Sequence, residues 1–245
     1  MIRDIRTVLW IEWKQIFPRN EGLRSGWANL AAIVIILGIF LPLQFGTQLV
    51  RSPLAAALWI WFPLLLIIVN VSDSFAGERE RHTLETLLSS RLPDRSILIG
   101  KIAAGVGYGW GISILCMFLG LAAINVIHWR GHFVFYSLGT ALAILLLSFL
   151  ISCLASEVGV LVSLHASTVR QATQTLGFSM MAIWLGFVGL SYILPKTLKA
   201  GISSILKGLG LSTVVILAIA LFMLIDGFLF IAAQHRFRRA RLLLD

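Results

Sequence analysis

The chain has 245 residues, of which 58% are hydrophobic and only 13% are charged, and its mean hydropathy is +0.92. Soluble domains carry about 25% charged residues, so this composition excludes a soluble protein and predicts a membrane protein. The formal net charge of +9 is explained by membrane topology and by attraction to anionic lipid headgroups, and it does not argue for nucleic acid as a partner.

The first 24 residues predict a helix that lies in the membrane interface. Charged residues interrupt this segment, so it lacks the apolar core of a cleavable signal peptide. Its apolar residues instead recur at helical spacing until Pro18, and they are Ile2, Ile5, Leu9, Trp13 and Ile16. The pattern is typical of an amphipathic helix on a membrane surface.

Six long apolar runs follow, and only Asp226 is charged within them. A bilayer core about 30 Å thick needs roughly 20 apolar residues per helix, so each run predicts one span. The runs are apolar on all sides, which excludes the alternating strands of a membrane barrel. They cover residues 27–45, 54–71, 102–127, 133–155, 172–194 and 209–233.

The predicted fold class is therefore all-α, a polytopic membrane protein with six transmembrane helices. We expect a single transmembrane domain over residues 1–245. Within it, 1–24 form the interfacial helix, 27–233 the six-helix membrane region and 234–245 a basic tail.

The basic residues predict the orientation, because loops that stay in the cytoplasm retain Lys and Arg. Six spans with a cytoplasmic N-terminus place fifteen basic residues inside and five outside. The five outer ones are Arg51, Arg130, Lys196, Lys199 and Lys207. We therefore expect a multi-pass protein of the cell inner (plasma) membrane with both termini in the cytoplasm.

Two further stretches have recognisable patterns. The glycine pairs Gly105/Gly109 and Gly107/Gly111 have the spacing that lets helices approach closely in lipid. They predict packing within the chain or, as the alternative, a dimer interface. Residues 195–210 are too apolar for a solvated loop and predict a pair of short interfacial or re-entrant helices on the outer side.

The first cytoplasmic loop contains a charged stretch, FAGERERHTLETLLSS at residues 75–90. From Glu78 to Arg95 four acids balance four arginines, whereas a helix built only to lie on anionic lipid would be biased towards basic residues. Leu84, Leu87 and Leu88 share one helical face. A helix of this kind is expected to press into a groove on another protein, and a solvated interfacial helix is the alternative.

The segment AGERERHTLETLLSSRLPDRSILIGK resembles the first cytoplasmic loop of the type-two ABC transporter permeases. That family's pattern is roughly G-E-[RK]-E-x-G-T-L-E-x-L-L, followed by I-L-x-G-K at the start of the third span. Two departures are visible, since His82 stands where glycine is usual and the expected proline is displaced to Pro93. The matching residues are Gly77, Glu78, Arg79, Glu80, Thr83, Leu84, Glu85, Leu87, Leu88, Ile97, Leu98, Gly100 and Lys101.

The resemblance implies a permease subunit of an ABC exporter, whose partners are a separate ABC ATPase subunit and a second permease subunit, identical or different. It implies that residues 78–88 form a coupling helix that binds the ATPase. Leu84, Leu87 and Leu88 would anchor it, and Glu80, Arg81 and Glu85 would orient it through ion pairs. Glu78, Arg79 and Thr83 complete the expected partner-binding set.

No catalytic residue and no metal site are expected on this chain. The phosphate-binding sequence GxxxxGK[ST] is absent, because Gly100 and Lys101 are followed by Ile102. The chain is therefore not expected to be an enzyme or to hold a cofactor, and ATP and Mg would bind the partner ATPase.

Three polar residues in the predicted spans are candidates for a transport path. Asp226 is costly in lipid, which favours a functional or paired position, although it could also lie near the basic tail at the interface. Asn70 and Asp73 could line a cytoplasmic entrance, and helix capping or headgroup contact explains them equally well.

Two other classes stay open as alternatives. A membrane-embedded enzyme would need clustered catalytic residues at one face of the membrane. A non-transporting anchor or assembly subunit would form the complex without substrate-dependent stimulation of its ATPase. The sequence does not identify a substrate, and the direction of transport rests on the resemblance.

Overall fold

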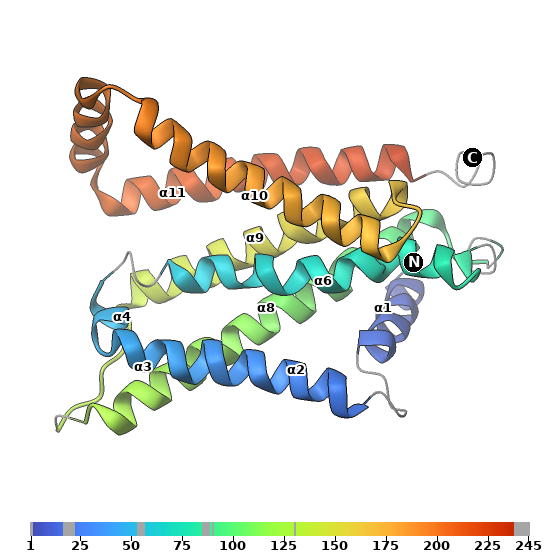
Figure 1. The fold of residues 1–245 in the computed structure, drawn as a ribbon, viewed down its shortest axis with the longest axis horizontal. Helices are drawn as coiled ribbons and strands as arrows, with labels where there is room; N and C mark the ends of the chain where they lie inside the picture. Colours follow the sequence, from blue (N-terminus) through green and yellow to red (C-terminus); the bar gives the residue numbers. More distant parts are fainter. Residues whose placement is uncertain are drawn as a thin grey trace.

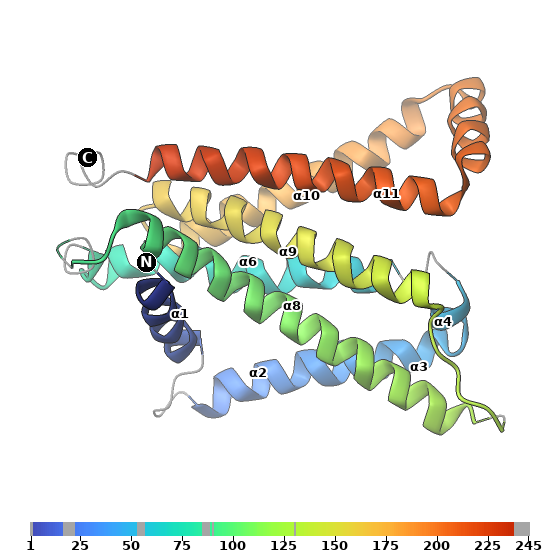
Figure 2. The ribbon, with the colours of Figure 1, turned by 180° about the vertical axis from the view of Figure 1, so that it is seen from behind.

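The protein is described here from a computed structural model. The described residues are 2–16, 23–52, 57–84, 89, 91–129 and 131–237. They form helices and connecting turns with no β-strand among them, which confirms the predicted all-α class. Long helices run back and forth in one bundle, and α1 (Ile2–Ile16) lies across one end of it (Figure 1, Figure 2). We call this end of the bundle the α1 end and the other the opposite end.

Five of the described helices are long and apolar enough to cross a membrane. Four are apolar over most of their length, and the fifth is apolar from Ser212 onward. They correspond to the second to sixth predicted spans, so five of the six predicted long apolar helices are confirmed, as expected of a membrane protein. The five are α6 (Leu58–Glu80), α8 (Asp94–Ile127), α9 (Leu138–His165), α10 (Val169–Ile193) and α11 (Lys196–Arg236).

The first predicted span is helical but differs from the other five. It consists of α2 (Leu23–Ile35), the π-helical segment η1 (Ile36–Phe40) and α3 (Leu41–Phe45), and α4 (Gln48–Arg51) follows after a turn. Its apolar part, Leu30–Phe45, is shorter than the spans of the other five. A sixth crossing therefore stays a prediction.

Helix α1 packs against the first turns of α8. Val8 is buried there, and a Cβ atom on Gly100 would lie 2.6 Å from a methyl carbon of Val8. Only glycine at position 100 allows α1 to lie this close. Ile2, Trp10 and Trp13 stay exposed on α1, so its apolar side is only partly used within the chain.

Helices α6 and α8 are in close contact through the first of the two predicted glycine pairs. A Cβ atom on Gly105 would lie 2.7 Å from Val71, and one on Gly109 would lie 2.3 Å from Ile67. Both neighbours belong to α6, so Gly105/Gly109 serve packing within the chain. Gly111 has nothing within 4 Å of its Cβ position.

The connections at the two ends of α9 and the bend inside α11 follow from local chemistry. Ser137 and Thr168 cap α9 and α10, each accepting a hydrogen bond from the backbone N–H three residues on. Gly210, with φ 73° and ψ 153°, bends α11. Residues 196–209 form one helix before this bend, so the predicted pair of short helices is wrong in number (Figure 1).

A side chain of α9 bonds to backbone groups of α6. The hydroxyl of Ser163 accepts from the backbone N–H groups of Phe75 and Ala76, at 3.0 and 2.9 Å, and donates to the carbonyl of Ser72 at 3.0 Å. All four residues are buried. The two helices are thereby fixed to each other close to the α1 end, just before the charged loop.

Candidate functional site

The helix that carries the start of the charged segment does not continue past Glu80. Helix α6 ends at Glu80, and the backbone N–H of Thr83 turns back to the carbonyl of Glu78 at 2.9 Å. The N–H of His82 bonds to the carbonyl of Arg79 at 3.1 Å. This pair of bonds is a Schellman motif, which ends helices. The prediction of a single helix over residues 78–88 is therefore wrong.

His82 occupies the left-handed position of this motif, with φ 56°. Glycine is the usual residue at that position, because a Cβ atom is strained there. The sequence pattern of the type-two permeases also has glycine at this place. Leu84 resumes helical geometry after the turn, whereas Glu85, Leu87 and Leu88 lie outside the described residues.

Glu78 is part of a buried ionic cluster rather than of an exposed surface. The ammonium group of Lys101 lies 2.9 Å from Glu78 Oε1 and 2.6 Å from Glu12 Oε1, and it donates to the carbonyl of Ser74 at 2.7 Å. It also lies 4.7 Å from the centre of the Phe75 ring. All three donors of the ammonium group are therefore used. This Lys101 cluster joins α1, α6 and α8.

The burial of this cluster makes each charge dependent on the others. Lys101 is only 2% exposed, and Glu78 and Glu12 are 6% and 8% exposed. An isolated charge at such a depth would cost several kcal/mol of desolvation free energy. Removing one member would leave its partners buried without compensation.

Arg79 and Glu80 connect the end of α6 to the junction between α9 and α10. The guanidinium of Arg79 donates to the carbonyls of Ala166 and of Leu164, the latter at 3.1 Å. The carboxylate of Glu80 accepts from the backbone N–H of Val169 at 3.0 Å. The arginine thus meets carbonyls at the end of α9, and the glutamate meets an N–H at the start of α10. Each charge lies at the helix terminus that it stabilises.

Arg81 pairs with Asp73 on the surface of α6. Its guanidinium donates to both carboxylate oxygens, at 2.6 and 2.5 Å. Gly77 lies between them along the helix, and a Cβ atom there would be 1.9 Å from the Asp73 carboxylate. The pair is largely exposed to solvent, so we expect it to stabilise the fold by no more than about 1 kcal/mol.

Leu84 is also engaged within the chain. It is buried in the hydrophobic core at the α1 end, in the same cluster as Val8, Phe75 and Ile97. Its predicted role as an anchor on a partner stays a prediction, and in this chain the side chain packs within the protein's own core. Thr83 stays at the surface, and its hydroxyl donates to the carbonyl of Glu78 at 3.2 Å.

The candidate path residues have different neighbours. Asn70 donates to the carbonyl of Leu66 at 3.1 Å, one turn back on α6, and Asp73 is paired with Arg81. Asp226 is buried on α11, and neither carboxylate oxygen has a hydrogen-bond partner among the described residues. It is close enough to Glu157 of α9 for the two carboxyl groups to interact electrostatically.

Four residues of this region were not predicted as site residues from the sequence. They are Glu12, Lys101, Glu157 and Ser163. Glu12 and Lys101 had a signal in the sequence. Glu12 lies one helical turn after Val8, and Lys101 is surrounded by apolar residues, so each charge needs a partner if it is buried. Glu157 lies two residues beyond the end of a predicted span and could have been tested for a partner in the same way. Ser163 offered no signal, because a buried serine has many uses.

Comparison with known proteins found no protein-family model that matches the chain and no curated protein that matches it.

Proposed function

We propose that the chain is the transmembrane permease subunit of an ATP-binding cassette exporter, and that a separate ATPase subunit docks at its α1 end. One observation carries the proposal. The segment that resembles the family's ATPase-binding loop is bonded through Glu78 to Lys101 of α8, which also binds Glu12 of α1. Arg79 and Glu80 bond it to the α9–α10 junction. A displacement of this loop would therefore act on several long helices at once.

The arrangement of the helices is consistent with this function. The α1 end would be cytoplasmic, because most of the basic residues in the described part of the chain lie at that end. The segment α2–η1–α3 would be the sixth crossing, and the apolar residues exposed on α1 would lie in the cytoplasmic interface of the plasma membrane. A second permease subunit would complete the transport path.

The partner would bind exposed residues, because the charged residues at the end of α6 already have partners in the chain. Arg91 and Arg95, on either side of the start of α8, are exposed at the α1 end. They are therefore the residues that we assign to ATPase contact. Glu78, Arg79 and Glu80 would instead transmit the motion of the bound ATPase to the helices.

Affinity purification from native membranes in mild detergent tests this proposal. A tagged wild-type chain is expected to bring down a subunit with a phosphate-binding loop, detected by mass spectrometry. The double variant Arg91→Glu/Arg95→Glu is expected to lose it while keeping its elution volume and melting temperature. Lys196→Glu/Lys199→Glu, with the same change of charge at the opposite end, is the matched control and is expected to retain the subunit.

Two results would contradict the proposal. One is a wild-type chain that brings down no ATPase under conditions that preserve other membrane complexes. The other is an ATPase that is retained equally by wild type and by the Arg91→Glu/Arg95→Glu variant, which would move the docking surface away from this loop.

A further inference from the structure

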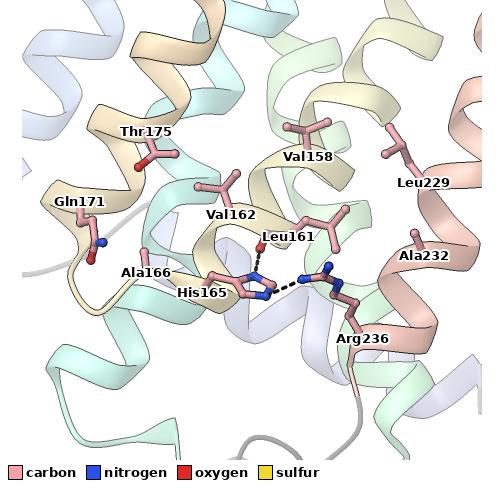
Figure 3. A pocket seen from close by; sticks show the side chains of 10 residues that line it. All are labelled: Val158, Leu161, Val162, His165, Ala166, Gln171, Thr175, Leu229, Ala232 and Arg236. Atoms are coloured by element: carbon pink, nitrogen blue, oxygen red, sulfur yellow. Dashed lines mark hydrogen bonds between the residues drawn. The ribbon is translucent and has the colours of Figure 1, made fainter. Parts of the chain in front are cut away.

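A cleft of about 540 Å³ opens between α9, α10 and α11 at the α1 end of the bundle (Figure 3). Val158, Leu161 and Val162 of α9 line one wall, and Leu229 and Ala232 of α11 line another. None of the residues that form the Lys101 cluster lines this cleft, so the cleft is a separate feature of the described chain.

The cleft has an apolar inner part and a polar mouth. His165 and Arg236 are the last residues of α9 and α11, whereas Val158 and Leu229 lie seven residues earlier on the same helices. At 1.5 Å per residue, the inner part is about 10 Å deeper along the helices than the mouth. Figure 3 shows the same order, with Arg236 and His165 at one end and Val158 and Leu229 at the other.

The charge at the mouth is positive and is held in place. Arg236 is the one charged residue among the ten that line the cleft as described. Its guanidinium lies 2.8 Å from His165 Nε2, and His165 Nδ1 lies 2.8 Å from the carbonyl of Leu161 (Figure 3). In this arrangement Nδ1 donates and Nε2 accepts, so the imidazole is neutral and positions the arginine. The other N–H groups of the guanidinium remain available to an anion.

The position of the cleft selects the kind of molecule that can reach it. All three of its helices include candidate membrane spans, and α10 and α11 expose large apolar side chains such as Phe178, Trp184 and Phe228. These surfaces must face acyl chains or another apolar surface in a membrane. A ligand with an apolar chain in the membrane and an anionic group at its surface matches the cleft, which has an apolar inner part and a positively charged mouth.

From this match we propose that the cleft binds one membrane lipid with an anionic headgroup. The phosphate lies against Arg236 at the mouth, and an acyl chain lies along Val162, Leu229 and Ala232 in the inner part. Basic pockets between transmembrane helices are a known type of anionic lipid site. The inference does not depend on the transporter proposal, since it needs no ATPase and no cargo.

Native mass spectrometry of the full chain, released from detergent, tests the proposal with phosphatidylglycerol and phosphatidylcholine as probes. The wild type is expected to retain one phosphatidylglycerol and to show no comparable retention of phosphatidylcholine. Arg236→Gln is expected to lower the phosphatidylglycerol affinity by about tenfold, because one charge-assisted contact is lost. Arg6→Gln, at an exposed arginine of α1 at the same end, is the matched control and is expected to bind as the wild type does.

A second variant tests the apolar part of the cleft independently of charge. Ala232→Trp fills the inner part and keeps Arg236, so it is expected to lose the lipid as well. Glycerol 1-phosphate, which has the anionic group without the chains, is expected not to compete at concentrations at which phosphatidylglycerol binds.

Three outcomes would overturn the proposal. Arg236→Gln could bind phosphatidylglycerol as tightly as the wild type, or Arg6→Gln could weaken it equally, which would mean a general attraction to basic surfaces. Glycerol 1-phosphate could displace the lipid while Ala232→Trp has no effect, which would mean a soluble-anion site. A wild type that takes up no lipid, and that Ala232→Trp converts from dimer to monomer, would mean that a second copy of the chain fills the cleft.

Discussion

Lys101 connects three helices through one ammonium group, and its burial determines what that connection contributes. The group lies between Glu12 of α1 and Glu78 of α6. A buried ion pair is weak evidence for stability, because desolvation offsets much of the attraction between the charges. The cluster is better explained by the specific position that it gives to α1 and to the end of α6.

Replacing Lys101 by methionine tests this explanation. The variant leaves two buried carboxylates without their cation, so it is expected to lower the free energy of unfolding by about 3 kcal/mol or more. The triple variant Glu12→Gln/Glu78→Gln/Lys101→Met removes all three charges and is expected to recover most of that loss. Thermal melting in detergent measures both, and a triple variant no more stable than the single one would contradict the explanation.

Asp226 and Glu157 differ from the Lys101 cluster because no cation lies between them in the described structure. Both are buried, and neither oxygen of Asp226 has a hydrogen-bond partner among the described residues. Buried acids in membrane spans without a partner are expensive, which favours a role in function over one in stability.

Removing these acids is therefore expected to stabilise the protein. Asp226→Leu and Glu157→Met are each expected to raise the free energy of unfolding by about 1 kcal/mol, because an unpaired buried polar group is replaced by an apolar one. Melting of the purified variants measures this effect. A lower melting temperature for both would show that the acids have stabilising partners.

The end of α6 is the element that determines how the charged loop is presented. Its Schellman motif places His82 in the left-handed region at φ 56°. The backbone strain is confined to this position. The next residue, Thr83, closes the motif with a hydrogen bond from its backbone N–H to the carbonyl of Glu78.

His82→Gly is expected to stabilise the protein by about 1 kcal/mol, since glycine adopts this conformation without a Cβ penalty. His82→Ala keeps the penalty and is the matched control, with no gain expected. Melting temperatures of the two variants decide the point, and equal values would mean that the turn is not strained at this residue.

A second element-level test concerns the packing of η1 on α8. A Cβ atom on Gly38 would lie 3.5 Å from the Cβ of Cys116, which is at the short end of the disulfide range. Gly38→Cys is therefore expected to form a disulfide with Cys116 on mild oxidation, visible as a shift on non-reducing gels. Gly38→Cys combined with Cys116→Ser is the control, and cross-linking that persists in it would point to another partner.

The existence of the long helices could be predicted from the sequence, because a run of apolar residues longer than about 20 has few alternatives in a membrane. Helix ends were less predictable. The charged stretch has high helix propensity, yet α6 ends at Glu80, where Arg79 and Glu80 bond to the α9–α10 junction. That choice of partner depends on residues more than 80 positions away, which no local pattern contains.

In the candidate site, too, the segment could be predicted from the local sequence, whereas its bonding partners could not. Composition and resemblance predict that the charged loop is a functional segment, and this stays a prediction. The partners within it could not be predicted, since Glu78 meets Lys101 and Glu12 instead of a residue one helical turn away. The π-helical segment η1 could not be predicted from hydropathy either, because hydropathy carries no information on the hydrogen-bond pattern of a helix.

At the scale of the whole molecule, the α1 end gathers the features that a motor subunit would need. The loop between α6 and α8 lies there, together with α1, the α9–α10 junction and the end of α11 (Figure 1, Figure 2). The last residues of α6 bond directly to α8 and to the start of α10, and Lys101 of α8 also binds Glu12 of α1. The central claim is that an ATPase subunit binds at this end and moves these helices through the loop.

Site-specific photo-crosslinking in native membranes tests that claim most directly. A photoreactive amino acid is placed at Arg91, exposed in the loop, or at Trp129, exposed at the opposite end. The account predicts that a subunit with a phosphate-binding loop is captured from position 91 and not from position 129. An equal yield from both positions, or capture of no ATPase from position 91 in a chain that is correctly inserted, would contradict it.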